Sequence, residues 1–125
     1  MVVTGARTAF PKTGYVSLSQ IRDGLENTIL VVESKNCSPD WTEPRDLDFD
    51  TMSFTINSKS APSVSSDHPQ GPLVCFADGA VYHLSPKTTA TELKAMLTIA
   101  GNEDISRRDL VGRGVLSDHR RDTNR

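Results

Sequence analysis

The chain has 125 residues and a formal net charge of −2, with 36% hydrophobic and 6% aromatic residues. This length suits one domain with a modest core, and the near-neutral charge gives no electrostatic footprint for nucleic acid. Because no run reaches the roughly 18–20 apolar residues that cross a membrane, and no secretory signal opens the chain, we expect no membrane segment.

The first third of the chain predicts an irregular start, a short helix and a strand. Ser17 and Gln20 have the spacing of a capping box, and Gly24 is a natural helix end, so we expect a helix near 17–23. The apolar, β-branched run 28–33 is continuous rather than alternating, which is typical of a central strand covered on both faces.

The middle of the chain predicts two polar loops around one strand. Residues 34–50 form a long polar stretch, typical of a packed surface loop, and Trp41 within it either anchors the loop to the core or stacks on a ligand. Residues 52–57 alternate apolar and polar, which predicts a half-buried strand, and 58–70 form the second loop.

A β-hairpin is the strongest local prediction. Two apolar runs, 73–77 and 80–84, flank Asp78-Gly79, and this dipeptide between strand-like runs favours a type I′ turn with positive φ at both central residues. Cys75 lies in the first run. We expect Cys75 and the loop residue Cys37 to be free thiols, with a bridge between them as the alternative in an oxidising compartment.

After the hairpin, one helix and a polar tail are predicted. Thr89 and Glu92 stand at capping-box spacing, and Gly101 ends a helix over 89–99. Its apolar residues recur on one helical face: Leu93, Met96 and Leu97. Residues 102–125 are rich in Arg and Asp without apolar periodicity, which predicts a disordered tail. We therefore expect one α+β domain over 1–101, an antiparallel sheet of about four or five strands with short packing helices.

Three ordered segments form a recognisable pattern. One runs from 19 to 33, one spans 41–50, and in the third His68 is followed, after nine residues, by Asp78-Gly79. The pattern resembles the large planctomycete-type family of unknown function described as prepilin-like proteins with a His-x9-Asp-Gly domain. The residues that carry the resemblance are Asp23, Gly24, Asn27, Thr28, Glu33, Trp41, His68, Asp78 and Gly79.

The resemblance implies a non-catalytic structural or interaction domain related to type II secretion pseudopilins. It implies the bacterial envelope or secretion as the location, and protein partners such as other pilin-like subunits. Family members typically begin with a prepilin leader and a long apolar helix, and residues 1–16 contain neither. We therefore expect a pseudopilin-like globular head without the long N-terminal helix, whose location does not follow from the family automatically.

Two further hypotheses remain open. Asp46, Asp48, Asp50 and Glu33 supply the oxygen ligands that calcium prefers, as pseudopilins that bind calcium in their C-terminal loops suggest by analogy; the alternative is a salt-bridged loop that includes Arg45. His68 and Asp78 are candidates for an acid–base pair. The alternative is structural, with Asp78 bonding backbone N–H groups in the turn and His68 donating to a backbone carbonyl.

Known catalytic patterns are missing around these residues. His83 has no partner at zinc-ligand spacing, and the chain contains neither a nucleophile elbow nor a phosphate-binding loop. We therefore expect no enzyme and no cofactor apart from the calcium hypothesis, and an enzyme that uses His68 and Asp78 is the least favoured reading.

Overall fold

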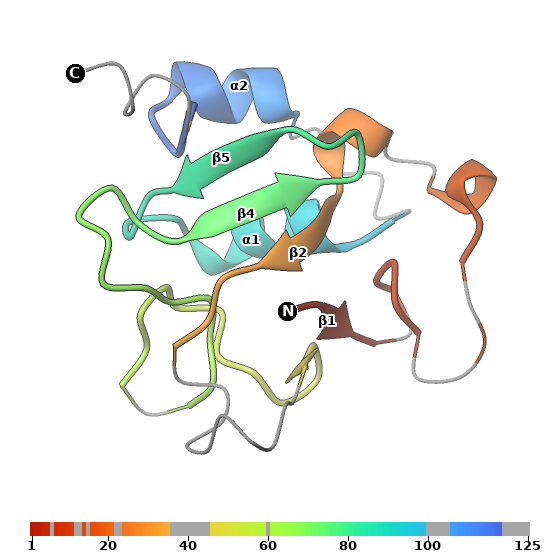
Figure 1. The fold of residues 1–125 in the computed structure, drawn as a ribbon, viewed down its shortest axis with the longest axis horizontal. Coiled ribbons are helices and arrows are strands. Elements are labelled where there is room, and N and C mark those ends of the chain that lie inside the picture. The colour runs from red at the N-terminus through yellow and green to blue at the C-terminus, as the bar shows by residue number, and fades with distance from the viewer. Residues whose placement is uncertain are drawn as a thin grey trace.

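The computed structural model describes residues 1–5, 7–11, 14, 16–21, 24–35, 46–59, 61–99 and 106–118. An antiparallel four-stranded sheet forms its centre, with strands in the order β2 (Ile29–Val32), β4 (Leu73–Phe76), β5 (Val81–Leu84) and β6 (Leu116–Asp118) (Figure 1). A smaller parallel pair joins β1 (Val3–Thr4) to β3 (Leu47–Asp48). With the helices below, this confirms the predicted α+β class.

In the described part of the chain, two α-helices and two 3-10 turns complete the fold. The helices are α1 (Ala90–Leu97) and α2 (Arg107–Gly112), and the turns are η1 (Leu18–Gln20) and η2 (Leu25–Asn27). Figure 1 shows α1 behind the sheet and α2 beyond β5. No helix within the described ranges is long and apolar enough to cross a membrane.

The core lies between the sheet and α1. Val74, Phe76 and Leu84 project from β4 and β5 into one hydrophobic cluster with the buried face of α1. The apolar side chains predicted for that helix, Leu93, Met96 and Leu97, are all at most 2% exposed. Only one face of the sheet is therefore used for this core.

The capping box of α1 is confirmed. Thr89 Oγ1 accepts a hydrogen bond from the backbone N–H of Glu92 at 3.2 Å, and Glu92 Oε1 accepts one from the N–H of Thr89 at 3.0 Å. At the predicted helix near 17–23, Gln20 Oε1 accepts from the N–H of Ser17 at 2.8 Å. There, however, the described helix is only the single 3-10 turn η1.

The hairpin is confirmed, but its predicted turn type is wrong. The N–H of Phe76 donates to the carbonyl of Ala80, and the N–H of Gly79 donates to the carbonyl of Phe76, both at 2.9 Å. Three residues therefore connect the strands, and only Gly79 among them has a positive φ, 89°. This is the arrangement of a type I turn followed by a glycine bulge, in which the extra residue Ala77 removes the need for a left-handed Asp78.

The prediction that 28–33 is a central, doubly covered strand is also wrong. β2 lies at one edge of the sheet, and Val31 on its outward face is 43% exposed. Ile29 and Val32 are buried in the core, while the N-terminal Met1 pairs with Val32 along the strand edge. The continuous apolar run thus reflects one buried face and one open apolar face rather than two buried faces.

Residues 52–57 do not form the predicted strand. Met52 and Ile56 are buried as the alternation requires, but the backbone turns, because the N–H groups of Thr51 and Met52 both donate to the carbonyl of Asp48. Asn57 then takes a left-handed φ of 58°. The alternating pattern correctly predicted that Met52 and Ile56 are buried. The turns at both ends of 52–57 keep this segment from pairing with another strand.

The predicted disordered tail is wrong for residues 106–118. Ser106 Oγ accepts from the N–H of Asp109 and starts α2, and β6 then pairs with β5. Leu110 and Leu116 are at most 1% exposed. Because α2 has only six residues and β6 only three, neither is long enough to show a period in the sequence.

Candidate functional site

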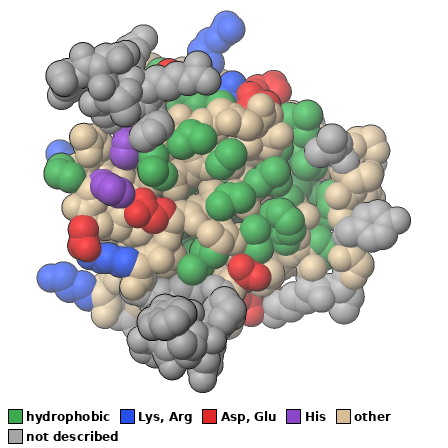
Figure 2. All heavy atoms as spheres, in the orientation of Figure 1, with side chains coloured by type: hydrophobic (Ala, Val, Ile, Leu, Met, Phe, Trp, Pro, Cys, Tyr) green, Lys and Arg blue, Asp and Glu red, His purple; other side chains and the backbone are tan. Residues whose placement is uncertain are grey.

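The sheet face that points away from α1 is apolar and largely uncovered. Val31 pairs with Cys75, and Cys75 pairs with Val81, so the three side chains project on the same face. Val31 is 43% and Val81 38% exposed, and Leu73 and the free thiol Cys75 are half-buried. We call these four residues the open sheet face; Figure 2 shows hydrophobic side chains gathered over it.

The open sheet face is slightly hollowed. A depression of about 340 Å³ lies over β2, β4 and β5. Its lining is almost entirely apolar, with Glu33 as the one charged residue among the described side chains that form it. Contiguous exposed apolar surface of this kind often marks a site of contact with another molecule.

A polar rim of Glu33, His68 and His83 borders this face. One Glu33 oxygen, Oε1, accepts from the N–H of Leu73 at 3.0 Å, and the other, Oε2, lies 3.3 Å from His68 Nε2. The rings of His68 and His83 meet edge to face with centroids 6.1 Å apart. Figure 2 shows histidine side chains next to an acidic side chain at the margin of the hydrophobic patch.

His83, rather than His68, holds the preceding loop through a backbone carbonyl. Its Nδ1 lies 3.0 Å from the carbonyl oxygen of Gly71, and its side chain is buried. His68 instead pairs with Glu33, so the predicted role of His68 belongs to the other histidine. Next to the rim, the hydrogen bond and charge of Lys35 hold the pKa of Asp67 below its usual value.

The predicted acid–base pair of His68 and Asp78 is not assembled. Asp78 lies at the turn of the hairpin, where Oδ1 accepts from the N–H of Ala80 at 3.1 Å and the carboxylate binds Arg107 Nη1 at 2.9 Å. His68 binds Glu33 at the opposite end of the hairpin, because the register pairs Leu73, at the start of β4, with His83 near the end of β5. The structural alternative for Asp78, a hydrogen bond to a backbone N–H group in the turn, agrees with its contact with Ala80.

The first and third segments of the sequence pattern, 19–33 and 68–79, meet at both ends of β2. At its start, the carbonyl of Thr28 accepts from the N–H of Ala77 at 2.8 Å, next to the Asp78 turn. At its end, Glu33 contacts His68. Since β2 and β4 are antiparallel, residues spaced along β2 reach opposite ends of the hairpin.

The remaining pattern residues are mostly structural in their contacts. Gly24 has a φ of 96°, and its carbonyl accepts from Thr28 Oγ1 at 3.1 Å. Asn27 Oδ1 accepts from the backbone N–H of Arg107 at 2.9 Å. Five residues named from the sequence lie outside the described part of the chain: Asp23, Cys37, Trp41, Arg45 and Gly101.

The calcium candidates do not form one cluster. Asp46 Oδ1 accepts from the N–H of Val2 at 3.3 Å, and Asp48 Oδ1 accepts from the N–H of Asp50 at 2.9 Å, while Glu33 belongs to the polar rim. Across the described ranges, no three side chains of the His, Cys, Asp and Glu types gather as a metal site requires. Calcium binding stays a prediction, which a melting curve with calcium and with chelator tests.

Sequence reasoning missed Arg107 because it lies in the segment predicted to be disordered. Its guanidinium carbon lies over two aromatic rings, 5.2 Å from the centroid of Phe76 and 5.4 Å from that of Tyr82. The Ser-x-x-Asp spacing of Ser106 and Asp109, a helix-start signal, was the local indication that this segment is ordered.

Comparisons with protein-family models, curated proteins and solved structures found no match.

Proposed function

We propose that this chain is a non-catalytic, pseudopilin-like interaction domain of the bacterial envelope, and that its open sheet face binds another pilin-like subunit. The observation that carries the proposal is the exposure of Val31 and Val81 side by side with Cys75 on a hollowed sheet face. Contiguous apolar surface of this kind is typical of contact sites between proteins.

The surroundings of the face agree with this role. Fully burying an exposed valine contributes about 1.5–3 kcal/mol, and Val31 and Val81, at 43% and 38% exposure, each gain the corresponding fraction on association. The polar rim of Glu33, His68 and His83 borders the apolar centre, as in interfaces where polar groups set the orientation of the partner. The resemblance to prepilin-like proteins names the kind of partner.

A second copy of this chain is the pilin-like subunit with which to test the proposal. We expect sedimentation velocity to show association that rises with concentration, and Val81→Lys to abolish it, because a lysine on the apolar face would be desolvated on contact. Val111→Lys is the matched control, since Val111 is similarly exposed, 42% against 38% for Val81, but lies on α2.

The two substitutions give different results if the open sheet face is the contact surface. Loss of association in Val81→Lys with retention in Val111→Lys supports docking through the open sheet face. A wild-type chain that stays monomeric at every concentration overturns the proposal, and so does an equal effect of the two substitutions. Circular dichroism of both variants checks that each retains the fold.

A further inference from the structure

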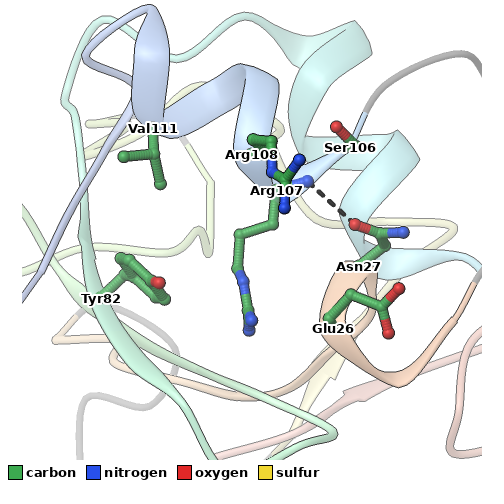
Figure 3. Close-up of a pocket in the computed structure, with 7 residues that line it drawn as sticks. All are labelled: Glu26, Asn27, Tyr82, Ser106, Arg107, Arg108 and Val111. Carbon is green, nitrogen blue, oxygen red and sulfur yellow. Dashed lines mark hydrogen bonds between the residues drawn. The ribbon is translucent and has the colours of Figure 1, made fainter.

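A separate cavity of about 540 Å³ lies between η2, β5 and α2. Figure 3 shows Tyr82 and Val111 on one side of it, Glu26 and Asn27 on the other, and Arg107 between them. Tyr82 pairs with Val74 and so lies on the core side of the sheet, away from the open sheet face. The volume is in the range of sites that take small molecules.

Arg107 is held in position, and among the described residues only Asp78 pairs with its guanidinium. Its Nη1 binds both oxygens of Asp78 at 2.9 Å, and its guanidinium lies over the rings of Phe76 and Tyr82. A guanidinium has five N–H donors, and Asp78 engages only one nitrogen. Because the side chain is 20% exposed, the remaining donors can meet a ligand without prior reorganisation.

Arg108 adds a second cation to the same wall. It lines the cavity from α2, is exposed, and forms no ion pair with any residue in the described ranges. Since Asp78 balances the charge of Arg107, the positive charge of Arg108 decides the sign of this wall. Glu26 on the far wall repels an anion and therefore favours its placement against α2.

The same cavity has an apolar side. The ring of Tyr82 is half-buried, and Val111 beside it is 42% exposed. We propose that this cavity binds a small molecule in which an oxyanion, carboxylate or phosphate, is attached to a compact apolar group. The oxyanion binds Arg107 and Arg108, and the apolar group lies on Tyr82 and Val111.

Calorimetric titration with phenyl phosphate, benzoate and inorganic phosphate tests this inference at physiological salt. We expect saturable binding of at least one aromatic anion, tighter than that of inorganic phosphate because only the aromatic anions contact Tyr82 and Val111. The tighter of phenyl phosphate and benzoate identifies the phosphate or the carboxylate as the natural head group.

Arg108→Gln is the decisive variant because Arg108 is exposed and its loss leaves the core intact. We expect it to weaken binding about tenfold, the effect of one lost charged hydrogen bond. Arg113→Gln is the control: it removes the same charge just after α2, where Arg113 is 58% exposed and lies 3.6 Å from Glu92 outside the cavity. No saturable binding, or equal weakening by both substitutions, overturns the inference.

Discussion

Gly71 and Gly79 show how two residues of the same type and similar φ have different structural roles. Both have a positive φ, 102° and 89° respectively. A Cβ on Gly71 would lie 1.9 Å from the carbonyl oxygen of Leu84, whereas one on Gly79 would meet no atom within 4 Å apart from those of its two chain neighbours. At Gly71 the absence of a side chain lets the loop before the hairpin touch the backbone of β5.

Substitution by alanine separates these two roles. We expect Gly79→Ala to lower the free energy of unfolding by about 1 kcal/mol, the cost of a left-handed alanine. Gly71→Ala adds a collision with backbone atoms that cannot move aside easily, so we expect a loss of about 3 kcal/mol or more. Urea denaturation of both variants measures the difference, and equal losses would contradict the close approach at Gly71.

Still at the scale of single residues, the sequence predicted a contact of Asp78 but not the contact that His68 makes. The contact of Asp78 with Ala80 is local, between residues two apart, and turn chemistry predicts it. The contact of His68 with Glu33 joins residues 35 positions apart and depends on the pairing of β2 with β4. Local preferences carry no information about such a pair.

At the scale of elements, α1 is the part of the fold that the sequence predicts best. Its capping box and its buried face both depend on residues within one or two turns of each other, so their spacing along the chain is already their spacing in space. The strand predicted over 52–57 failed because a strand exists only when another strand pairs with it.

Thr89 gives a direct test of the capping box. We expect Thr89→Ala to lower the free energy of unfolding by about 1 kcal/mol, because the N–H of Glu92 loses its acceptor and Glu92 Oε1 loses the hydrogen bond from the Thr89 hydroxyl. Thr91→Ala is the control, since Thr91 is exposed within the same helix and alanine is a better helix former there. Thermal melts of the two variants measure the effect, and similar melting temperatures would argue against the box.

At the scale of the whole molecule, residues 106–118 belong to the domain. β6 completes the sheet beside β5, Leu110 and Leu116 enter the core, and Arg107 links α2 to the hairpin turn through Asp78. This segment also forms one wall of the cavity. Its removal would therefore affect both the core and the inferred binding site.

Alanine substitution at the adjacent residues Leu110 and Val111 measures how much this segment contributes to the free energy of unfolding. We expect Leu110→Ala to lower the free energy of unfolding by about 2–5 kcal/mol, since the side chain is fully buried and its loss leaves a cavity. Val111→Ala removes a side chain that is 42% exposed and should change it by less than about 0.5 kcal/mol. Equal, small effects in chemical denaturation would mean that the segment is not part of the core.

The sequence by itself determined the α+β class, the hairpin around Asp78-Gly79 and helix α1, because each depends on residues that are neighbours along the chain. Tertiary structure alone decided that β2 is an edge strand, that residues 106–118 join the domain, and that Glu33 meets His68 while Asp78 meets Arg107. These features arise from pairing between distant segments. Short polar elements gain their order from the surface they cover, and that surface exists only once the chain has folded.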